Sequence, residues 1–426
     1  MKILIISHNP MCANDNMGKT LSNLFNNFSR NDLCQLYFRD QKCDFSVCSS
    51  FYLISEKHLF NHLFKFWQPS GIEIKECYTV KKTKTEEEIY KIGRNSKTYV
   101  YFLRNFLWLI AKPFDGCLKK WIIKERPTAI FFAAGDYSFA YDFVYKIGKK
   151  FDIPIYIYFT DEYYFISKKS SLMNNLQKLQ FQNAFNKLMK NSKKYYCISE
   201  SMLKLYKNNF NIPGEILMNS INVENIEKQA RNILKREKMI ISYIGNISFG
   251  RWKSLIDISQ VINKLNIECK EEKYEFNVFS GESSEDLIKK IQNVEGLHFC
   301  GSIGEKKIKE VMFDSDILVH TESFEKENIE SVKHSVSTKI PDYLASGCLI
   351  LAYGPDEVES INYLRRNSAA LICNSIEELY NSLKTIGDLN VSPILNISKD
   401  LLNKNHDCEK SYSMLLRDFT EINDGK

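Results

Sequence analysis

Two strand-to-helix joints in the second half of the chain combine a helix start with a cation. The first is Ser337–Pro355, STKIPDYLASGCLILAYGP, where Ser337 or Thr338 can cap a helix. Such a helix directs free backbone N–H groups and the positive end of its dipole toward the carboxyl edge of a sheet, where α/β folds bind phosphate. Lys339 adds a full charge there, and Asp342 on the same face can accept hydrogen bonds from ribose hydroxyls. The simpler interpretation is a well-capped surface helix with an incidental Lys/Asp pair.

The second joint is SYIGNISFGRWKSL, in which a strand runs into a glycine-containing loop and then into a helix. Gly245 and Gly250 let the backbone approach a phosphate closely, and Arg251 offers a planar fork that matches two oxygens. One joint of this kind is common, but two in one half of a chain are more specific for an anionic ligand. The opening segment NPMCANDNMGKTLSNL holds a third glycine turn, at Gly18, without the spacing of a P-loop.

Strands that alternate with helices must position these joints. Apolar, strand-like runs occur at 2–7, 129–133 and 153–159, and a second alternating set begins at Met239. This rhythm indicates an α/β fold with parallel sheets covered on both faces.

The same pattern predicts the division of the chain. We expect a first domain at 1–220, a second at 221–400 and a C-terminal helix at 401–426. A charged connecting helix or linker is expected at 224–238 and a long loop at 321–336.

The net charge of +6 is concentrated in one region. Residues 57–126 contain fifteen Lys/Arg and seven Asp/Glu, a local excess of eight. Within them, 99–126 interleaves aromatic and aliphatic side chains with basic ones, which suits the interface of an anionic membrane. Charged residues and a proline interrupt this run too often for a membrane span. A helix packed on its own domain is the alternative interpretation. No nucleic-acid recognition module is present, so we expect no nucleic-acid partner.

The cysteines and the amino terminus indicate a cytoplasmic protein. The twelve cysteines form no CxxC pair and no Cys/His spacing suited to zinc, so we expect reduced thiols and no metal site. The opening MKILIIS is too short for a secretory signal and is typical of a buried first strand.

The order of these segments resembles that of the family 4 retaining glycosyltransferases, which have the GT-B fold. The resemblance covers nearly the whole chain. It is carried by KILIISHNP…MGKTLSNL, CISESMLKLYKNNF…EILMNSIN, SYIGNISFGR, VEGLHFCGSIGEKKIKEVMFDSDILVH and STKIPDYLASG. The last two are specific in this order and spacing, whereas the first is generic. The resemblance implies two Rossmann-like domains facing across a cleft, with the C-terminal helix crossing back to the first domain.

The resemblance also implies a donor site without metal or cofactor. Arg251 and Lys339 would neutralise the diphosphate of a nucleotide sugar, and Asp342 would bind the ribose. The backbone of residues 301–303 would line the base pocket, and the loop of Gly18 would face the donor phosphates. The full donor-binding set expected on this basis is Gly18, Asn246, Gly250, Arg251, Gly301, Ser302, Ile303, Ser337, Thr338, Lys339 and Asp342.

The sequence departs from the usual family pattern at several positions. The pattern has two glutamates separated by seven residues, and His334 and Asp342 stand there instead, which we interpret as a subtype. Asn246 occupies the place where many members carry an arginine. The histidine of the family's first domain is not evident. Asp136 lies close to that position and could act near an acceptor hydroxyl or cap a helix.

The activity implied is transfer of a sugar from a nucleotide diphosphate sugar to an acceptor hydroxyl with retained configuration. The expected catalytic residues are Arg251, Lys339 and Asp136. The basic, aromatic segment 99–126 favours a lipid-linked saccharide acceptor at the inner face of the plasma membrane, as in bacterial surface polysaccharide synthesis. A soluble saccharide or a protein acceptor remains open. Two other classes fit the same fold: a sugar-nucleotide 2-epimerase, and a non-catalytic protein that binds a nucleotide or a partner.

Overall fold

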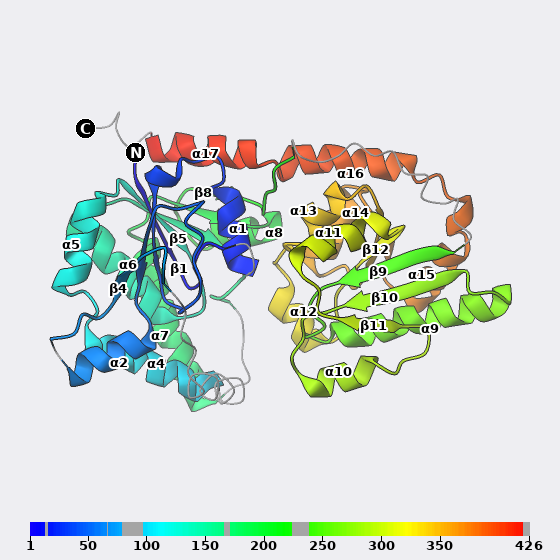
Figure 1. Cartoon of the computed structure of the whole chain (residues 1–426), viewed down its shortest axis with the longest axis horizontal. Coiled ribbons are helices and arrows are strands. Elements are labelled where there is room, and N and C mark those ends of the chain that lie inside the picture. Colours follow the sequence, from blue (N-terminus) through cyan, green and yellow to red (C-terminus); the bar gives the residue numbers. More distant parts are fainter. Residues whose placement is uncertain (13–15, 66, 79–96, 166–170, 224–237, 421–426) are drawn as a thin grey trace. The chain divides into compact units, whose positions relative to one another are not determined.

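The chain folds into two compact α/β units. The computed structural model describes residues 1–12, 16–65, 67–78, 97–165, 171–223 and 238–420. Unit 1 comprises Met1–Met218 and Cys408–Lys426, and unit 2 comprises Asn219–Asp407 (Figure 1). The second boundary therefore follows residue 407 rather than 400. Helix α16 (Ser392–Asn405) runs through the expected boundary and packs on unit 2, where the Ser398 hydroxyl donates to the Ala369 carbonyl at 3.0 Å. The expected linker at 224–238 lies outside the described residues except for Lys238.

Unit 1 is built on an eight-stranded sheet in the order β4-β3-β2-β1-β5-β6-β7-β8. All neighbours are parallel except β3 and β4. Its strands are β1 (Ile3–Ser7), β2 (Leu33–Tyr37), β3 (Ser50–Leu53), β4 (Ile72–Ile74), β5 (Ala129–Ala133), β6 (Ile155–Phe159), β7 (Lys194–Cys197) and β8 (Gly214–Ile216). The central strand shows why both faces are covered: Ile3 and Ile5 enter one hydrophobic cluster, while Leu4 and Ile6 enter another. Side chains alternate along a strand, so a strand that is apolar throughout must be buried on both sides.

The helices of unit 1 cover these two faces (Figure 1). They are α1 (Asn16–Leu24), η1 (Arg30–Asp32), α2 (Glu56–Phe64), α4 (Lys97–Ala111), α5 (Gly116–Glu125), α6 (Ser138–Phe151), α7 (Leu172–Met189), α8 (Glu200–Lys207) and α17 (Cys408–Thr420). The segment 99–126 forms two helices, α4 and α5, whose inner faces bury Trp108 and Trp121 in the core. Among the described residues, no helix is both long and apolar enough to cross a membrane.

Unit 2 is built on a six-stranded parallel sheet in the order β11-β10-β9-β12-β13-β14. Its strands are β9 (Met239–Ile244), β10 (Tyr274–Phe279), β11 (His298–Gly301), β12 (Ile317–Thr321), β13 (Leu349–Tyr353) and β14 (Leu371–Cys373). Its helices are α9 (Arg251–Cys269), α10 (Glu285–Ile291), α11 (Glu305–Asp314), α12 (Lys326–Val332), α13 (Ile340–Ala345), α14 (Glu359–Arg366), α15 (Ile376–Lys384), η2 (Ile386–Asp388) and α16. The expectation of a long loop at 321–336 is wrong, because α12 occupies its centre.

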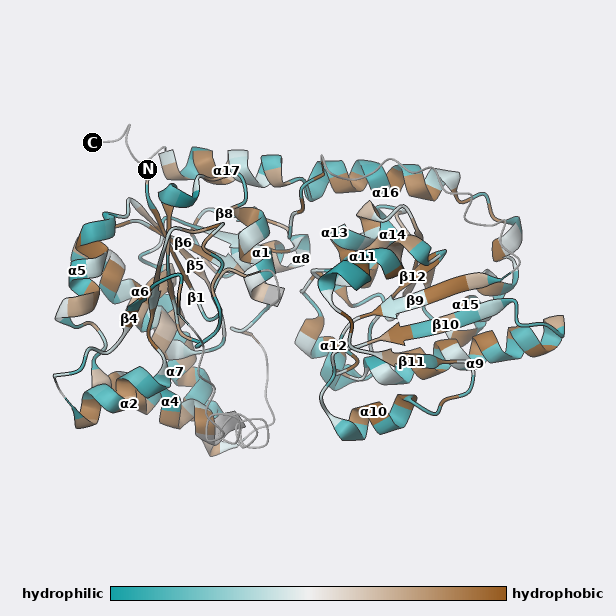
Figure 2. Cartoon of the chain, in the orientation of Figure 1, coloured by the Kyte–Doolittle hydropathy of each residue, from teal (hydrophilic) through white to brown (hydrophobic). Residues whose placement is uncertain are grey.

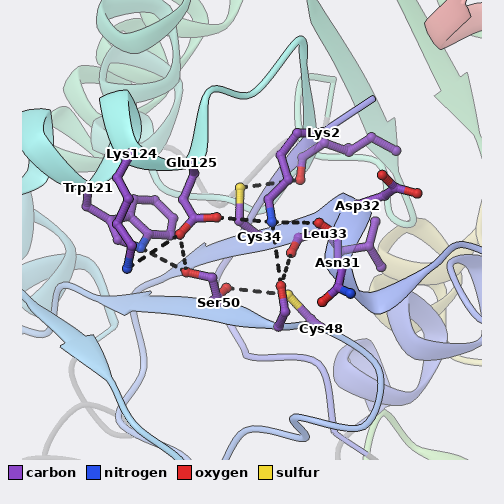
Figure 3. Close-up of polar contacts among 12 residues, drawn as sticks. Lys2, Asn31, Asp32, Leu33, Cys34, Cys48, Ser50, Trp121, Lys124 and Glu125 are labelled. Carbon is purple, nitrogen blue, oxygen red and sulfur yellow. Dashed lines mark hydrogen bonds and ion pairs between the residues drawn. The ribbon is translucent and has the colours of Figure 1, made fainter.

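The amino edge of the unit 1 sheet is closed by a polar network (Figure 3). Lys2 forms an ion pair with Glu125 at 3.0 Å and donates to the Asn31 carbonyl at 2.8 Å. Ser50 links α5 to β3, since it donates to Glu125 at 2.9 Å and accepts from Trp121 Nε1 at 3.0 Å. These residues hold the amino ends of the central strands together, at the edge opposite to the one where α/β sheets bind ligands.

The C-terminal helix α17 is fixed to the sheet of unit 1 through Asp418. Its carboxylate accepts from Lys194 Nζ at 2.5 Å and from the Tyr196 hydroxyl at 2.6 Å, and its carbonyl accepts from Tyr156 at 2.6 Å. Burial raises the pKa of Asp418, but the hydrogen bonds from Lys194 and Tyr196 outweigh it, so this pKa lies below its ordinary value. The helix therefore depends on a buried charged pair.

Removing this carboxylate is expected to destabilise the protein. Asp418→Ala should lower the free energy of unfolding by about 2 kcal/mol, because it removes the charged hydrogen bonds to Lys194 and Tyr196 and leaves Glu215 as the remaining ion-pair partner of Lys194. A carboxylate with a depressed pKa contributes stability above its unfolded pKa and loses it as the pH falls. The stability difference between the wild type and Asp418→Asn should therefore shrink below about pH 4. Urea unfolding at pH 7 and pH 3 measures both effects, and a difference that is equal at both pH values would contradict this account.

Candidate functional site

The candidate site lies at the carboxyl edge of the unit 2 sheet, where the strand order changes direction. Strand β9 comes first in the chain, and β10 and β12 flank it on opposite sides. The loops that follow β9 and β12 therefore leave from neighbouring strands, which pair through Ile241 with Ile317 and Ser242 with Leu318. In open α/β sheets, ligands bind at such a switch point.

Arg251 and Glu322 form the central ion pair of this edge. Arg251 is the first residue of α9, and Glu322 directly follows β12. Nε of Arg251 donates to Glu322 Oε2 at 2.9 Å, and Nη2 donates to Oε1 at 3.0 Å. The Glu322 side chain is only 3% exposed, and its backbone carbonyl accepts from the Ser254 hydroxyl at 2.8 Å. This pair of hydrogen bonds fixes the orientation of the guanidinium, and the carboxylate balances its charge at a largely buried position.

Lys339 brings a second cation to the same edge. A Cβ atom added to Gly245 would lie 1.7 Å from Nζ of Lys339, so the glycine leaves the space that the amine occupies. The amine also lies 5.4 Å from the centre of the Tyr243 ring. Burial and the Arg251 guanidinium lower the pKa of Lys339 to about 7, against the opposing effect of Glu322 and Asp342. Lys339 is therefore poised to gain a full charge when an anion arrives.

A neutral histidine completes the cluster. His320, in β12, has Nε2 3.9 Å from Glu322 Oε1, and this nitrogen has no hydrogen-bond partner among the described residues. Burial and the charges of Arg251 and Lys339 lower the pKa of His320 to about 3. The imidazole stays uncharged at neutral pH, so it adds no third cation.

The start of the α13 helix differs from the expectation. Neither Ser337 nor Thr338 caps it: the N-cap is Lys339, without a side-chain cap hydrogen bond, and Pro341 occupies the first turn. The Ser337 hydroxyl accepts from the Lys339 N–H at 3.4 Å, while the Ser337 N–H donates to the Ser360 hydroxyl at 3.0 Å. A hydrogen-bonded turn directly precedes the helix. In this turn the Ile340 N–H donates to the Ser337 carbonyl, so the N-cap falls at Lys339 rather than at Ser337 or Thr338.

The other expected donor-site residues of unit 2 lie in loops at this edge or at the end of β11. Gly250 has φ +74°, a backbone conformation that favours glycine, and a Cβ there would lie 2.4 Å from both Ser323 Oγ and Asn328 Nδ2. Asn246 is exposed, and its Oδ1 accepts from the Ser248 N–H at 2.5 Å.

The predicted base-pocket segment follows β11. Gly301 has φ +71°, Ser302 is exposed and Ile303 is half-buried. The Gly301 carbonyl accepts from the Ser280 N–H at 2.9 Å. Gly301 therefore ends β11, the edge strand beyond β10, and Ser302 and Ile303 follow it, whereas Arg251 and Glu322 come after β9 and β12.

Two expected residues belong to unit 1. Gly18 lies in α1, where a Cβ would come within 2.5 Å of the Pro10 carbonyl oxygen and 2.6 Å of Cys12 Sγ, so glycine is required for packing. Asp136 is exposed between β5 and α6, and Tyr137 rather than Asp136 is the N-cap of α6. The alternative of Asp136 as a helix cap is therefore wrong.

Glu322 is the residue of this site that sequence reasoning missed. The available signal was its place directly after the apolar run DILVHT, at the carboxyl end of a strand. Within the parts of the chain that are described, no group of three or more His, Cys, Asp or Glu residues could hold a metal ion.

Comparisons with known proteins address the fold. The sequence matches no protein-family model, and no curated protein matches it. Solved structures do match over almost the full length. HepE of Anabaena in complex with UDP and glucose has a TM-score of 0.62 at 9% identity, with 99% of this chain and 100% of that chain covered. The chain has the GT-B fold.

Two further matches support the same assignment. Trehalose-6-phosphate synthase OtsA has a TM-score of 0.63 at 10% identity, with 99% of each chain covered. The UDP-forming α,α-trehalose-phosphate synthase of Burkholderia xenovorans, in complex with glucose-6-phosphate, has a TM-score of 0.61 at 7% identity. That match covers 99% of this chain and 100% of the other. The two α/β units thus correspond to the two Rossmann-like domains of this fold.

Proposed function

We propose that the chain is a retaining glycosyltransferase that moves a sugar from a nucleotide diphosphate sugar to an acceptor hydroxyl. The observation that carries the proposal is the pair of cations, Arg251 and Lys339, at the switch point of the unit 2 sheet. Glu322 orients the first cation, and Gly245 makes room for the second. A diphosphate is a ligand whose negative charge a guanidinium and an ammonium at one sheet edge can stabilise.

The proposed sugar transfer requires few groups besides Arg251 and Lys339. The bond between the anomeric carbon and the diphosphate oxygen breaks, and a bond from that carbon to the acceptor oxygen forms on the same face. Negative charge grows on the leaving diphosphate, where Arg251 and Lys339 stabilise it. In the family that the sequence resembles, the departing phosphate takes the acceptor proton, so no separate base is required. Asp136 stays a candidate for a contact with the acceptor.

The acceptor that we propose is a lipid-linked saccharide at the inner face of the plasma membrane, used in bacterial surface polysaccharide synthesis. The basic and aromatic segment 99–126 supports it. For the donor, UDP is the first nucleotide to test, because HepE was solved with UDP and glucose and the Burkholderia synthase is UDP-forming.

A thermal-shift screen tests the proposal at the level of donor class. UDP, GDP, CMP and their sugar conjugates are compared with ATP and NAD. A nucleotide at a hundred times its dissociation constant should add about 2.7 kcal/mol of stability. We expect one nucleoside diphosphate to raise the Tm of the wild type and not that of Lys339→Met. If no nucleotide changes the Tm of the wild type, the transferase proposal fails in favour of a non-catalytic protein.

A further inference from the structure

A chain of buried hydrogen bonds in unit 2 ends one residue before Lys339. Nδ2 of Asn219 donates to the Thr338 carbonyl at 2.8 Å, and the asparagine is only 6% exposed. Thr338 directly precedes Lys339, the N-cap of α13. The bond to Asn219 therefore restrains the backbone from which the Lys339 side chain departs.

The amide of Asn219 carries a cost that its bond to Thr338 explains. Its Oδ1 is buried and has no hydrogen-bond partner among the described residues. A buried acceptor that is left unpaired is unfavourable, and an apolar side chain of the same size would avoid this cost. The use of an asparagine at this position is therefore the hydrogen bond that it donates to the Thr338 carbonyl.

His406 holds Asn219 from the other side. It is fully buried at the end of α16, with Nδ1 2.7 Å from the Asn219 carbonyl. A carbonyl only accepts, so Nδ1 carries the proton and Nε2 accepts from the Tyr363 hydroxyl at 2.8 Å. Burial lowers the pKa of His406 to about 4, so the ring is neutral at pH 7 and this tautomer is maintained. Asn405 extends the chain, because its Nδ2 donates to the Tyr363 hydroxyl at 3.0 Å.

Helices α14 and α16 support the same turn. Tyr363 and Ser360 lie three residues apart on one face of α14, and the Ser360 hydroxyl accepts from the Ser337 N–H at 3.0 Å. Helix α16 packs against α13, and Figure 2 shows hydrophobic and hydrophilic residues along α16, as in a helix with one packed face. The turn that presents Lys339 is thus held at Ser337 by α14 and at Thr338 by Asn219.

The place of the Lys339 amine depends on this turn. Nζ lies where a Cβ on Gly245 would come within 1.7 Å of it, so a small shift of the α13 start would move the amine out of that space. The charged and titratable groups that act on the amine or lie beside it are Arg251, Glu322, Asp342, His320 and Tyr243.

We propose that Asn219 and His406 are positioning residues that hold Lys339 at the candidate site through the Thr338 carbonyl. The inference rests on the proposed function, which gives the amine its task. Neither residue supplies a group to the diphosphate, and both act only through Lys339. Asn219 is the first residue of unit 2 and His406 the last but one, so both ends of this unit are tied to the turn that presents the cation.

The titration of Lys339 tests the inference without a ligand. The full chain is labelled with ¹³C at Cε of lysine, and the NMR signal of Lys339 is the one that Lys339→Met lacks. In the wild type we expect a pKa of about 7, because burial and the Arg251 guanidinium lower it. Asn219→Leu keeps the size of the side chain and removes its donor. The pKa of Lys339 should then rise to about 8 or higher, since losing one hydrogen bond corresponds to about tenfold in an equilibrium.

Asn266→Leu is the matched control. Nδ2 of Asn266 donates to the Tyr274 carbonyl at 2.9 Å, at the amino end of β10, so its loss should leave the titration of Lys339 unchanged. If Asn219→Leu does not fold, Tyr363→Phe removes the donor to His406 and should raise the pKa of Lys339 by a smaller amount. An equal pKa of Lys339 in the wild type and in the folded variant would overturn the inference. An ordinary lysine pKa of about 10.5 in the wild type would overturn it too, because nothing would then hold the amine.

Nucleotide binding and turnover measure the consequence for the proposed function. In Asn219→Leu the loss of affinity with rising pH should begin at about pH 8 instead of 7, and kcat should fall about tenfold. A lower free energy of unfolding with an unchanged titration of Lys339 would assign Asn219 a structural role only, against the inference. If the wild type binds no nucleotide of the thermal-shift screen while the titration still shifts in Asn219→Leu, the proposed function fails and the positioning role stands.

Discussion

Replacing Lys339 by methionine is expected to lower kcat roughly 10²–10³-fold, which is the usual effect of removing one group that stabilises leaving-group charge. The amine lies beside Gly245 and shares the sheet edge with Arg251, so its loss leaves a single cation for the diphosphate. Initial-rate measurements with the donor identified by the nucleotide screen give the comparison. Lys333→Met is the matched control, because Lys333 lies at the end of α12 beside Glu330 and should turn over normally. Near-normal turnover of Lys339→Met would refute the assignment.

The pH dependence of nucleotide binding separates a charge effect of Lys339 from a packing effect. Its pKa of about 7 in the free protein should rise when a diphosphate binds, so binding takes up a proton above pH 7. Affinity for the nucleotide should therefore fall as the pH rises from 7 to 9, by at most about tenfold per pH unit. Lys339→Met should show a flat profile, and titration calorimetry at several pH values measures both. A wild-type affinity that is independent of pH would contradict the charged state assigned to the complex.

The lowered pKa of Lys339 also predicts that the free energy of unfolding rises with pH, whereas the affinity for the nucleotide falls. A lysine whose pKa is lower in the folded state than in the unfolded state lowers the free energy of unfolding while the amine is charged. This penalty is relieved as the pH rises from 7 toward 10.5. Lys339→Met removes the penalty altogether. The free variant should consequently be no less stable than the wild type at pH 7, which distinguishes loss of function from loss of fold.

The positions of strands could be predicted from the sequence, because local hydrophobic patterns determine them. The runs at 129–133 and 239–244 carry their own hydrophobic signal, and the structure has strands there. Arg251 and Lys339 could also be selected as candidate site residues from the sequence, because a cation beside a glycine loop or a helix start is a local motif. The start of α13 was misassigned because a hydrogen-bonded turn through Ser337 competes with capping, and the sequence does not reveal which one forms.

The pairing of Glu322 with Arg251 could not be predicted in this way, because it depends on the order and register of the strands in the sheet. Its carboxylate meets Arg251 only because β12 lies next to β9, in a register that joins Ile317 to Ile241. Residues 251 and 322 are far apart in the chain, and nothing in either local pattern refers to the other. The fit of Lys339 against Gly245 is likewise a tertiary contact, set by how α13 returns to the sheet.

Removing Arg251 is expected to reduce activity and stability together. Arg251→Ala should lower kcat roughly 10²–10³-fold, because it deletes the guanidinium that we propose to stabilise the leaving diphosphate. It should also lower the free energy of unfolding by about 3 kcal/mol, because Glu322, only 3% exposed, would be left as an unpaired buried charge. Steady-state kinetics and urea unfolding measure the two effects independently.

The double variant Arg251→Met/Glu322→Gln separates these two effects. With both charges gone, neither member of the pair is left as an unpaired buried charge, so the stability lost in Arg251→Ala should largely return. Turnover should not return, because the cation that stabilises the leaving diphosphate is still absent. Recovery of turnover together with stability would mean that Arg251 acts only by holding the β9 and β12 loops in place, and it would leave Lys339 as the single catalytic cation of this edge.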